Sequence, residues 1–391
     1  MKKILGLLLA LCLIAGCTSA FAAGIPVEQV KIGYITIGDE NEGYSANHLN
    51  GLKEAQAALG ISDDQVLCKY NVPETEDAYE AAIDLAEQGC NIIFATSFGH
   101  ESYVFQAAAE YPNIQFCHAT GNSAMNSELT NVHNYFYAVY ESRYVSGVVA
   151  GMKLAQMIED GTITAENAKI GYVGAFPFAE VISGFTSFFL GARSQCPSVT
   201  MEVRYTNSWG DMALEKETAE ALIADGCVLI SQHADTTGAP SACEAAGVPC
   251  VGYNISMLPV APNTALTSAA GDWGAYVTYA VKCLIDGEEI ARDWCKGYSE
   301  GAVYTTELND SIVAPGTAEK VAELEEAFKA GTVKVFDTST FTVNGETLTS
   351  YTTAYGLEGI EMVSDGEFHE SSVRSAPYFD ILIDGITAVV E

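Results

Sequence analysis

Short apolar runs alternate with amphipathic segments along most of this chain. The apolar runs fit buried strands, and each is followed by a segment whose apolar residues recur with helical spacing. In one such segment Leu214, Ala221 and Leu222 share a face, away from Lys216 and Glu220. We therefore predict helices at 46–59, 76–88, 212–225 and 237–246. Strands that alternate with helices predict parallel sheets covered by helices on both faces.

The pattern also repeats within the chain. The run KIGYITIG at 31–38 recurs as KIGYVGAF at 169–176, and GCNIIFATSFGHES from Gly89 is matched by GCVLISQHADTT from Gly226. The strand-like run VLCKYN between the first pair is matched by VRYTNS between the second. Two such repeats predict an α/β fold with two similar, Rossmann-like parallel-sheet domains joined by a hinge.

The repeat sets the expected domain boundaries. The first α/β domain is expected over 30–140 and the second over 141–264. One more strand and helix within 265–310 is expected to return to the first domain, and 311–333 to the second. The chain would then cross between the domains three times, near Tyr140, Asn263 and Ser311.

Residues 334–391 have a different pattern. Alternating apolar and polar positions over 336–349 predict strands, with a turn at Asn344-Gly345. We expect a small C-terminal β extension that packs on the core.

The N-terminus has the pattern of an export signal. Lys2 and Lys3 precede an apolar stretch over 4–15, which is followed by Gly16 and Cys17. This pattern predicts a lipoprotein signal peptide over 1–16, a lipid on Cys17 and a linker over 17–29. The alternative is an ordinary signal peptide cleaved near 20–23. The lipid would anchor an exported protein to the outer face of the cell membrane.

A second apolar stretch, at 145–157, is short for a membrane span and contains Lys153. Its Gly147 and Gly151, four residues apart, are expected to let a helix pack closely against another element.

Charge and cysteine content narrow the class of protein. The chain has 18 basic and 51 acidic residues, a net charge of −33, which argues against a nucleic-acid partner. The acidity fits the solvated surface of a secreted protein, and attraction of a cationic ligand is the alternative. None of the eleven cysteines forms a CxxC pair, so neither a zinc site nor another cofactor is predicted.

Residues that follow the predicted strands are the candidate site, because ligands bind beyond the carboxyl ends of parallel strands. In two facing domains these ends line one cleft. Aromatic rings together with carboxylates and amides at these places fit a flat heteroaromatic ligand, held by stacking and by hydrogen bonds to its edge. The candidates are Tyr44, Phe98, His100, Phe176, Trp209, His233, Asp235, Tyr253, Asp272 and Trp273.

These motifs resemble the basic membrane protein (BMP, PnrA-like) family of substrate-binding lipoproteins. The resemblance rests on IGYITIGDENEGYSANHLNGL, ATSFGHES and NYFYAVYESRYVSGVVAGM. The motifs KIGYVGAFPFAEVISGFTSFFLGAR, TNSWGD, SQHADT, VGYN and GDWG are similar to its purine-binding branch. The resemblance covers about 30–331.

The resemblance implies a type I periplasmic-binding-protein fold and capture of a purine nucleoside or nucleobase for an ABC permease. It implies stacking by Tyr44, Phe176 and Trp209. It implies hydrogen bonds from Asp235 and Asp272 to the edge of the base. Ligand that contacts both domains would favour the closed state, which the permease would read.

Other functions stay open at this point. An enzyme is disfavoured because the first strand is not followed by a GxGxxG loop and the chain has no P-loop or GxSxG elbow. His233 and Asp235 could form an acid–base or metal pair, but two residues apart in a loop is a weak signal. A sensory receptor without transport is another alternative. Another ligand, such as a sugar, a flavin or a polyamine, is a third, and the acidic triplet Asp39, Glu40 and Glu42 would suit a polyamine.

Overall fold

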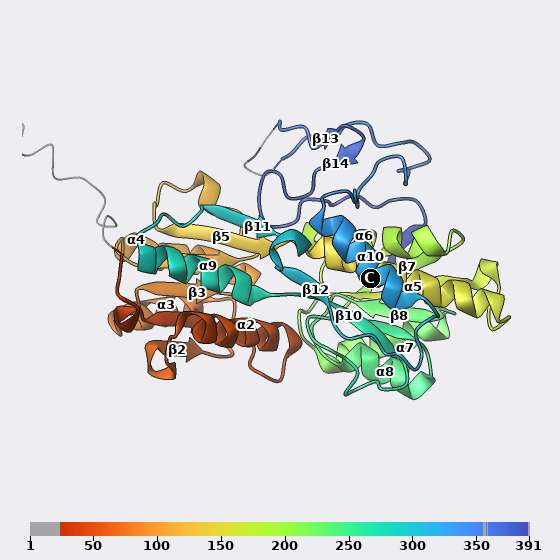
Figure 1. Cartoon of the computed structure of the whole chain (residues 1–391), viewed down its shortest axis with the longest axis horizontal. Helices are drawn as coiled ribbons and strands as arrows, with labels where there is room; N and C mark the ends of the chain where they lie inside the picture. The colour runs from red at the N-terminus through yellow and green to blue at the C-terminus, as the bar shows by residue number, and fades with distance from the viewer. Residues whose placement is uncertain (1–23, 355–356, 358, 390–391) are drawn as a thin grey trace, which may run out of the picture.

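The computed structural model describes residues 24–354, 357 and 359–389. The predicted signal peptide and Cys17 lie outside the described residues. The chain forms two lobes that lie side by side, each built on its own mainly parallel sheet (Figure 1). The two-sheet α/β fold predicted from the repeat is therefore confirmed.

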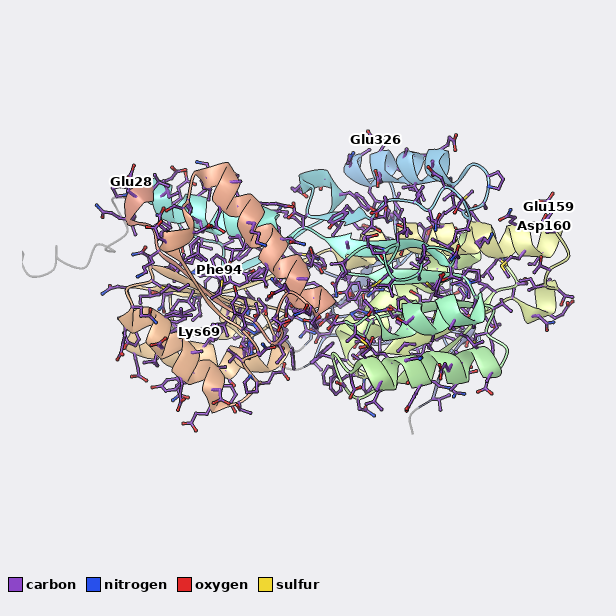
Figure 2. The ribbon with its side chains drawn as sticks, turned by 90° about the horizontal axis from the view of Figure 1, so that it is seen from below. Glu28, Lys69, Phe94, Glu159, Asp160 and Glu326 are labelled. Carbon is purple, nitrogen blue, oxygen red and sulfur yellow. The ribbon has the colours of Figure 1, made fainter. Side chains whose placement is uncertain are left out.

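The first lobe contains a six-stranded sheet in the order β11-β5-β4-β3-β1-β2, in which every pair is parallel. Its strands are β1 (Ile32–Ile35), β2 (Val66–Lys69), β3 (Ile92–Ala95), β4 (Gln115–Ala119), β5 (Val132–Tyr137) and β11 (Asp293–Lys296). Its helices are α2 (Gly43–Leu59), α3 (Glu76–Glu87), α4 (Glu101–Glu110) and α9 (Trp273–Asp286). Phe94 on β3 lies among the side chains of this lobe (Figure 2), with its ring 5.6 Å from that of Tyr34.

The second lobe contains a seven-stranded sheet in the order β12-β10-β9-β8-β6-β7-β15. Its strands are β6 (Lys169–Gly174), β7 (Thr200–Tyr205), β8 (Leu229–Gln232), β9 (Cys250–Tyr253), β10 (Ala265–Gly271), β12 (Val303–Thr305) and β15 (Ile386–Val389). Its helices are α5 (Val139–Glu159), α6 (Ala179–Gln195), α7 (Met212–Ala224), α8 (Gly238–Ala246) and α10 (Thr317–Lys329). Only β12 runs antiparallel to its neighbour, β10, among the pairs of this sheet that the structure describes.

The internal repeat is a structural repeat. The order β2-β1-β3-β4-β5 in the first lobe matches β7-β6-β8-β9-β10 in the second. The four predicted helices are present as α2, α3, α7 and α8. One predicted face is wrong: α7 exposes Leu214 and buries Glu215, whose carboxylate accepts hydrogen bonds from the backbone and hydroxyl of Thr236. A buried carboxylate with partners of its own can occupy a core position that periodicity reserves for an apolar residue.

The chain crosses between the lobes at other places than the sequence predicted. The strand at Ala265–Gly271 does not join the first lobe, because it pairs with β9 and β12 in the second sheet. The chain crosses directly after Tyr137, between Gly271 and Trp273, and again between Lys296 and Val303. Only α9 and β11 return to the first lobe, where α9 packs on α2 and β11 pairs with β5. The later crossings expected near Asn263 and Ser311 are therefore wrong.

Close packing of α5 against α6 holds the second lobe together. A methyl group at Gly147 would lie 2.1 Å from the carbonyl oxygen of Phe188, and one at Gly151 would lie 2.2 Å from that of Ala192. Glycine at both places is what lets the two backbones approach, as the spacing predicted. Among the described residues, no helix is both long enough and apolar enough to span a membrane.

The C-terminal residues form a loop-rich extension rather than the strands predicted over 336–349. The predicted turn is present, with Asn344 at φ 52° and Gly345 at φ 83° between the bonded pair Val343 and Glu346. The regular strands here are a short hairpin, β13 (Val363–Ser364) with β14 (Glu367–Phe368), and β15 on the second sheet. An alternating pattern yields strands only where a neighbouring strand can satisfy the backbone groups. The described residues of 336–349 form isolated bridges instead, Asp337 with Glu367 and Val343 with Glu346.

Nine cysteines, all free and mostly buried, lie within the described residues. They contribute to the core as small apolar side chains.

Candidate ligand-binding site

A pocket lies between the lobes, at the carboxyl ends of strands from both sheets. Its empty volume is about 340 Å³. The residues that line it come from both lobes: Ile37, Tyr44, Ser97, Phe98, Thr120, Glu180, Trp209, His233, Asp235 and Tyr253.

The first-lobe wall consists of aromatic rings and hydroxyl groups. The Glu42 carboxylate accepts from the backbone amides of Tyr44 and Ser45, which fixes the start of α2 and places Tyr44 at the pocket. The Tyr44 hydroxyl donates to the carbonyl of Thr96 at 2.6 Å. Phe98 follows β3 and remains 43% exposed. This wall therefore presents ring faces rather than charges.

Thr120 completes this wall from the end of β4. Its φ of 66° is unusual for a β-branched residue, and such backbone conformations concentrate at functional sites. Its buried hydroxyl has no hydrogen-bond partner within the described part of the chain. The hydroxyl is therefore free to bind a ligand.

The second-lobe wall carries the ionisable groups. His233 and Asp235 follow β8, and Glu180 lies in the first turn of α6. The amide of Asn254 donates to Asp235 Oδ1 at 2.8 Å, and His233 Nε2 lies 3.4 Å from Glu180 Oε1. Trp209 adds an aromatic ring after β7.

Burial decides the charge of this wall. The pKa of Asp235 lies well above its ordinary value. The main cause is burial of the carboxyl group, and the negative charges of Glu42, Glu215 and Glu180 add to it. Burial also raises the pKa of Glu180 to about 7, against the opposing charge of Arg143. The pKa of His233 lies well below its usual value, because of burial and then Arg143. At neutral pH we expect protonated Asp235 and neutral His233, so both can exchange uncharged hydrogen bonds with a ligand.

Arg143 on α5 is a buried cation that the sequence reasoning missed. Its guanidinium carbon lies 3.6 Å from the centre of the Tyr253 ring, and Nη1 donates to the carbonyl of Gln232 at 2.7 Å. Its Nε and Nη2 have no hydrogen-bond partner among the described residues. The sequence did contain a signal for this residue, since Arg143 is the single arginine in the apolar segment 139–159 and arginine is rarely buried without a specific partner.

The lobes touch across the mouth of the pocket, so this is a closed state. The backbone amide of Gly43 in the first lobe donates to the carbonyl of Asp235 in the second at 3.1 Å. The rings of Phe98 and Phe178, one from each lobe, are 5.6 Å apart. Ligand in the pocket would be enclosed by both lobes.

Six of the ten candidate residues line the pocket and four do not. Phe176 lies behind the wall, stacked on Phe178 at 5.1 Å and edge-on to Trp209. Trp273 is fully buried and stacked on His48 at 3.9 Å, which makes it a core residue. Asp272 caps α9 by accepting from the amide of Gly274 at 2.7 Å. Asp272 does not line the pocket, and its carboxylate caps a helix. This position differs from the predicted role of a hydrogen bond to the edge of the base.

His100 is also behind the wall. It is fully buried, with Nε2 2.9 Å from the carbonyl oxygen of Val72. Burial lowers its pKa to about 4, so it is a neutral core group. In the repeat, Phe98 lies six residues after Ile92 and Asp235 six after Leu229, the first residues of the equivalent strands β3 and β8. The counterpart of Asp235 in the repeat is therefore Phe98, and His100 lies two residues further along the chain.

Glu180 is the other pocket residue that the sequence reasoning missed. It follows Pro177 and Phe178 by two or three residues and reaches the pocket from the first turn of α6 rather than from a strand end. No group of three or more histidine, cysteine, aspartate or glutamate side chains in the described chain could hold a metal ion.

The fold is that of a type I periplasmic-binding protein, with a pocket between two parallel-sheet lobes. The sequence model of the Bmp family, described as ABC transporter substrate-binding protein PnrA-like, matches residues 34–335. The chain belongs to this family of substrate-binding proteins.

Similar proteins support the same assignment. A purine-binding protein of Brucella abortus is 33% identical over 79% of this chain and 83% of its own length. A protein of Haloferax volcanii with the provisional name ABC transporter glucose-binding protein is 29% identical, over 85% of this chain and 81% of its own length.

Solved structures share the fold at low identity. A solute-binding protein of an ABC transporter system from Aeropyrum pernix has a TM-score of 0.64 at 18% identity, with 78% of this chain and 93% of that chain covered. A transcriptional activator of the comK gene from Bacillus halodurans has a TM-score of 0.61 at 20% identity, with 76% and 97% covered.

Proposed function

We propose that this protein captures a purine nucleoside or nucleobase between its lobes and delivers it to an ABC permease. The observation that carries the proposal is a closed pocket with aromatic rings from both lobes and two carboxyl groups, the buried Asp235 and the partly buried Glu180. Ring faces such as those of Tyr44 and Trp209 suit a flat heterocycle, since stacking on a base is worth about 1–3 kcal/mol.

The carboxyl groups supply what stacking lacks, which is recognition of the edge of the base. Asp235 accepts from Asn254 on one oxygen, so a proton on the other oxygen can be donated to a ring nitrogen or carbonyl of the ligand. Glu180, whose pKa lies at about 7, can accept from an N–H group when ionised. This donor and acceptor pair matches the edge of a purine. The purine-binding relative adds support from an independent source.

Delivery follows from the two-lobe design. A ligand that contacts both walls stabilises the closed state by its differential affinity, and closure is what a permease can detect. The lipid on Cys17 would keep the protein at the outer face of the membrane, beside the permease. Both the anchor and the export signal remain proposals from the sequence pattern.

A sugar is the second candidate, and the Haloferax volcanii relative named for glucose binding favours it. Sugar rings also stack on aromatic side chains and bind carboxylates. A polyamine is less well matched, because the acidic groups nearest the pocket have raised pKa values and their burial favours the uncharged form.

Calorimetric titration of the chain that begins after Cys17, with adenosine, inosine, guanosine, adenine and glucose, tests the proposal. The protein would first be freed of carried-over ligand by unfolding and refolding. We expect one purine to bind at micromolar concentration or tighter. Trp209→Ala should weaken that binding by about tenfold or more through lost stacking. Trp294→Phe, which changes a tryptophan of β11 outside the pocket, is the matched control.

Failure of every purine to bind folded, ligand-free protein would reject the purine assignment. Binding of glucose alone would establish the second candidate. Equal binding by the Trp209→Ala protein would reject the pocket as the site.

A further inference from the structure

The described residues beyond the part of the chain that the family model matches, 336–354, 357 and 359–389, cross the junction of the two lobes. We refer to these residues as the C-terminal strap. In Figure 1 the strap, with its hairpin of β13 and β14, lies above the place where the two lobes meet. The strap is thus an addition to the binding-protein fold at the position of its hinge.

The strap is fixed to the second lobe. Its last strand, β15, continues the second sheet by pairing along β7, with Ile386 opposite Met201 and Val389 opposite Arg204. The guanidinium of Arg193 on α6 donates to the carbonyls of Asp384 and Thr340 in the strap. A sheet ladder and a two-point arginine contact make the strap move with this lobe.

The strap also covers two of the crossings between the lobes. Phe336 lies 5.7 Å from Tyr140, which follows the first crossing, and is stacked on Phe379 at 4.6 Å. A groove with an empty volume of about 880 Å³ separates the crossings from the strap, with Ala138 and Gly297 on one side and Phe368 on the other. Rotation of the lobes would change the shape of this groove.

Ser375 ties the strap to the first lobe through Asp293, next to a second strap contact, between Ser371 and Cys295 of β11. The hydroxyl of Ser375, which is fully buried, donates to Asp293 Oδ1 at 2.7 Å. Asp293 begins β11 and is held in the first sheet opposite Asn134. The neighbouring Arg374 also acts on this carboxylate, lowering its pKa against the larger effect of burial. The strap therefore holds both lobes while they are closed.

We propose that the C-terminal strap is a built-in restraint that favours the closed state of the two lobes through the contact of Ser375 with Asp293. The contact coexists here with the closed-state contact of Gly43 with Asp235. Because the strap moves with the second lobe, rotation of the first lobe away must break or rearrange the bond to Asp293. A bond present in only one of two states shifts their ratio.

This inference goes beyond the proposed function and does not depend on which ligand binds. The test measures the lobe separation in the ligand-free full chain. Spectroscopic labels would be attached through non-natural amino acids at exposed Asp64 on the first lobe and exposed Glu217 on the second, and their distance distribution measured by pulsed electron resonance. This leaves the nine free cysteines untouched.

Three substitutions grade the restraint. Ser375→Ala removes the hydroxyl bond and keeps the backbone bond to Asp293, and we expect the open population to rise about tenfold relative to the closed one. Ser375→Asp places a second carboxyl group against Asp293 and should open the lobes further. Asp293→Asn keeps an oxygen that accepts the bond and should stay closest to the parent. Ser339→Ala, which removes a serine bond internal to the strap, is the matched control and should change nothing.

The graded order of Ser375→Asp, Ser375→Ala and Asp293→Asn, with an unmoved Ser339→Ala control, would support the restraint. Unchanged distance distributions for both Ser375 variants would overturn it. A lower melting temperature of the Ser375 variants with unchanged distances would also overturn it, because Ser375 would then contribute only to the stability of the fold. Failure of all purines to bind would leave this result unaffected.

Discussion

The two walls of the pocket come from equivalent halves of one structural repeat, yet they carry different chemistry. The first-lobe wall offers the rings of Tyr44 and Phe98 with the hydroxyl of Thr120. The second-lobe wall offers Glu180, His233 and Asp235, backed by Arg143. Equivalent strands deliver Phe98 on one side and Asp235 on the other.

This contrast separates what the repeat conserves from what it leaves free. The strands and helices must keep their apolar positions to pack, so the two sheets remain alike. The residues after each strand are free of this packing requirement, so both walls can carry aromatic rings while only the second adds ionisable groups that form hydrogen bonds. A ligand would have to satisfy both walls, which makes it the link between the lobes.

The largest effect is expected from the ionisable wall. Asp235→Ala removes a buried carboxyl group and leaves the Asn254 amide unpaired, so we expect ligand affinity to fall about 100-fold. Asp235→Asn should stay within a few-fold of the parent, because an amide keeps an acceptor for Asn254 and a donor toward the ligand. Calorimetry on both variants would decide. An equally large loss in Asp235→Asn would mean that the ionised form binds.

Closure of the walls on each other is the next test. A methyl group at Gly43 would lie 2.7 Å from the backbone carbonyl oxygen of Asp235, so Gly43→Ala should hold the lobes apart. We expect about a tenfold loss of affinity with little change in melting temperature, because alanine is a good helix former. Asn41→Ala, at an exposed neighbouring position, is the control. Unchanged affinity in Gly43→Ala would show that binding needs no close approach here.

A smaller effect is expected on the pH dependence of stability, through Glu180 of the second-lobe wall. Glu180 has a pKa of about 7 in the folded protein and near 4.5 as its ordinary value. Its stabilising contribution is therefore fully present below about pH 4.5 and is lost as the pH rises through 7. Glu180→Gln should raise the melting temperature by a few degrees at pH 8 and by less at pH 5. A difference that is the same at both pH values would contradict the shifted pKa.

The smallest effect is expected behind the first-lobe wall. His100→Gln changes a buried residue that bonds to Val72 and does not line the pocket. The melting temperature should fall while the affinity of folded protein stays within about twofold of the parent. A loss of affinity as large as that of Asp235→Ala would show that His100 acts on the ligand after all. Side-by-side calorimetry and thermal unfolding give both quantities.

Most of the fold could be read from the sequence. Apolar runs predict buried strands such as Ile92–Ala95, and the helical spacing of apolar residues predicts helices such as Met212–Ala224. The internal repeat predicts two lobes. The return of the chain at 265–310 was misread because β10 is buried along its whole length. A strand that is buried throughout fits either sheet, and only its neighbours decide which one it joins.

The candidate site was read less completely. Strand-end logic found six lining residues, including Asp235 and Trp209, because parallel strands in each lobe end at one edge. It also selected four residues that lie just after strand ends but do not line the pocket: His100, Phe176, Asp272 and Trp273. It missed Glu180, which reaches the pocket from a helix, and Arg143, which lies behind it.

The sequence by itself determined the two parallel-sheet lobes, the shared edge where a ligand would bind, and the aromatic and acidic character of that edge. These properties follow from local periodicity and from the repeat. Only the tertiary structure decided which side chains turn into the pocket, which carboxyl groups hold protons and where the C-terminal strap ties the lobes together. Those outcomes depend on burial and on contacts between residues far apart in the chain, such as Ser375 with Asp293, which no local pattern encodes.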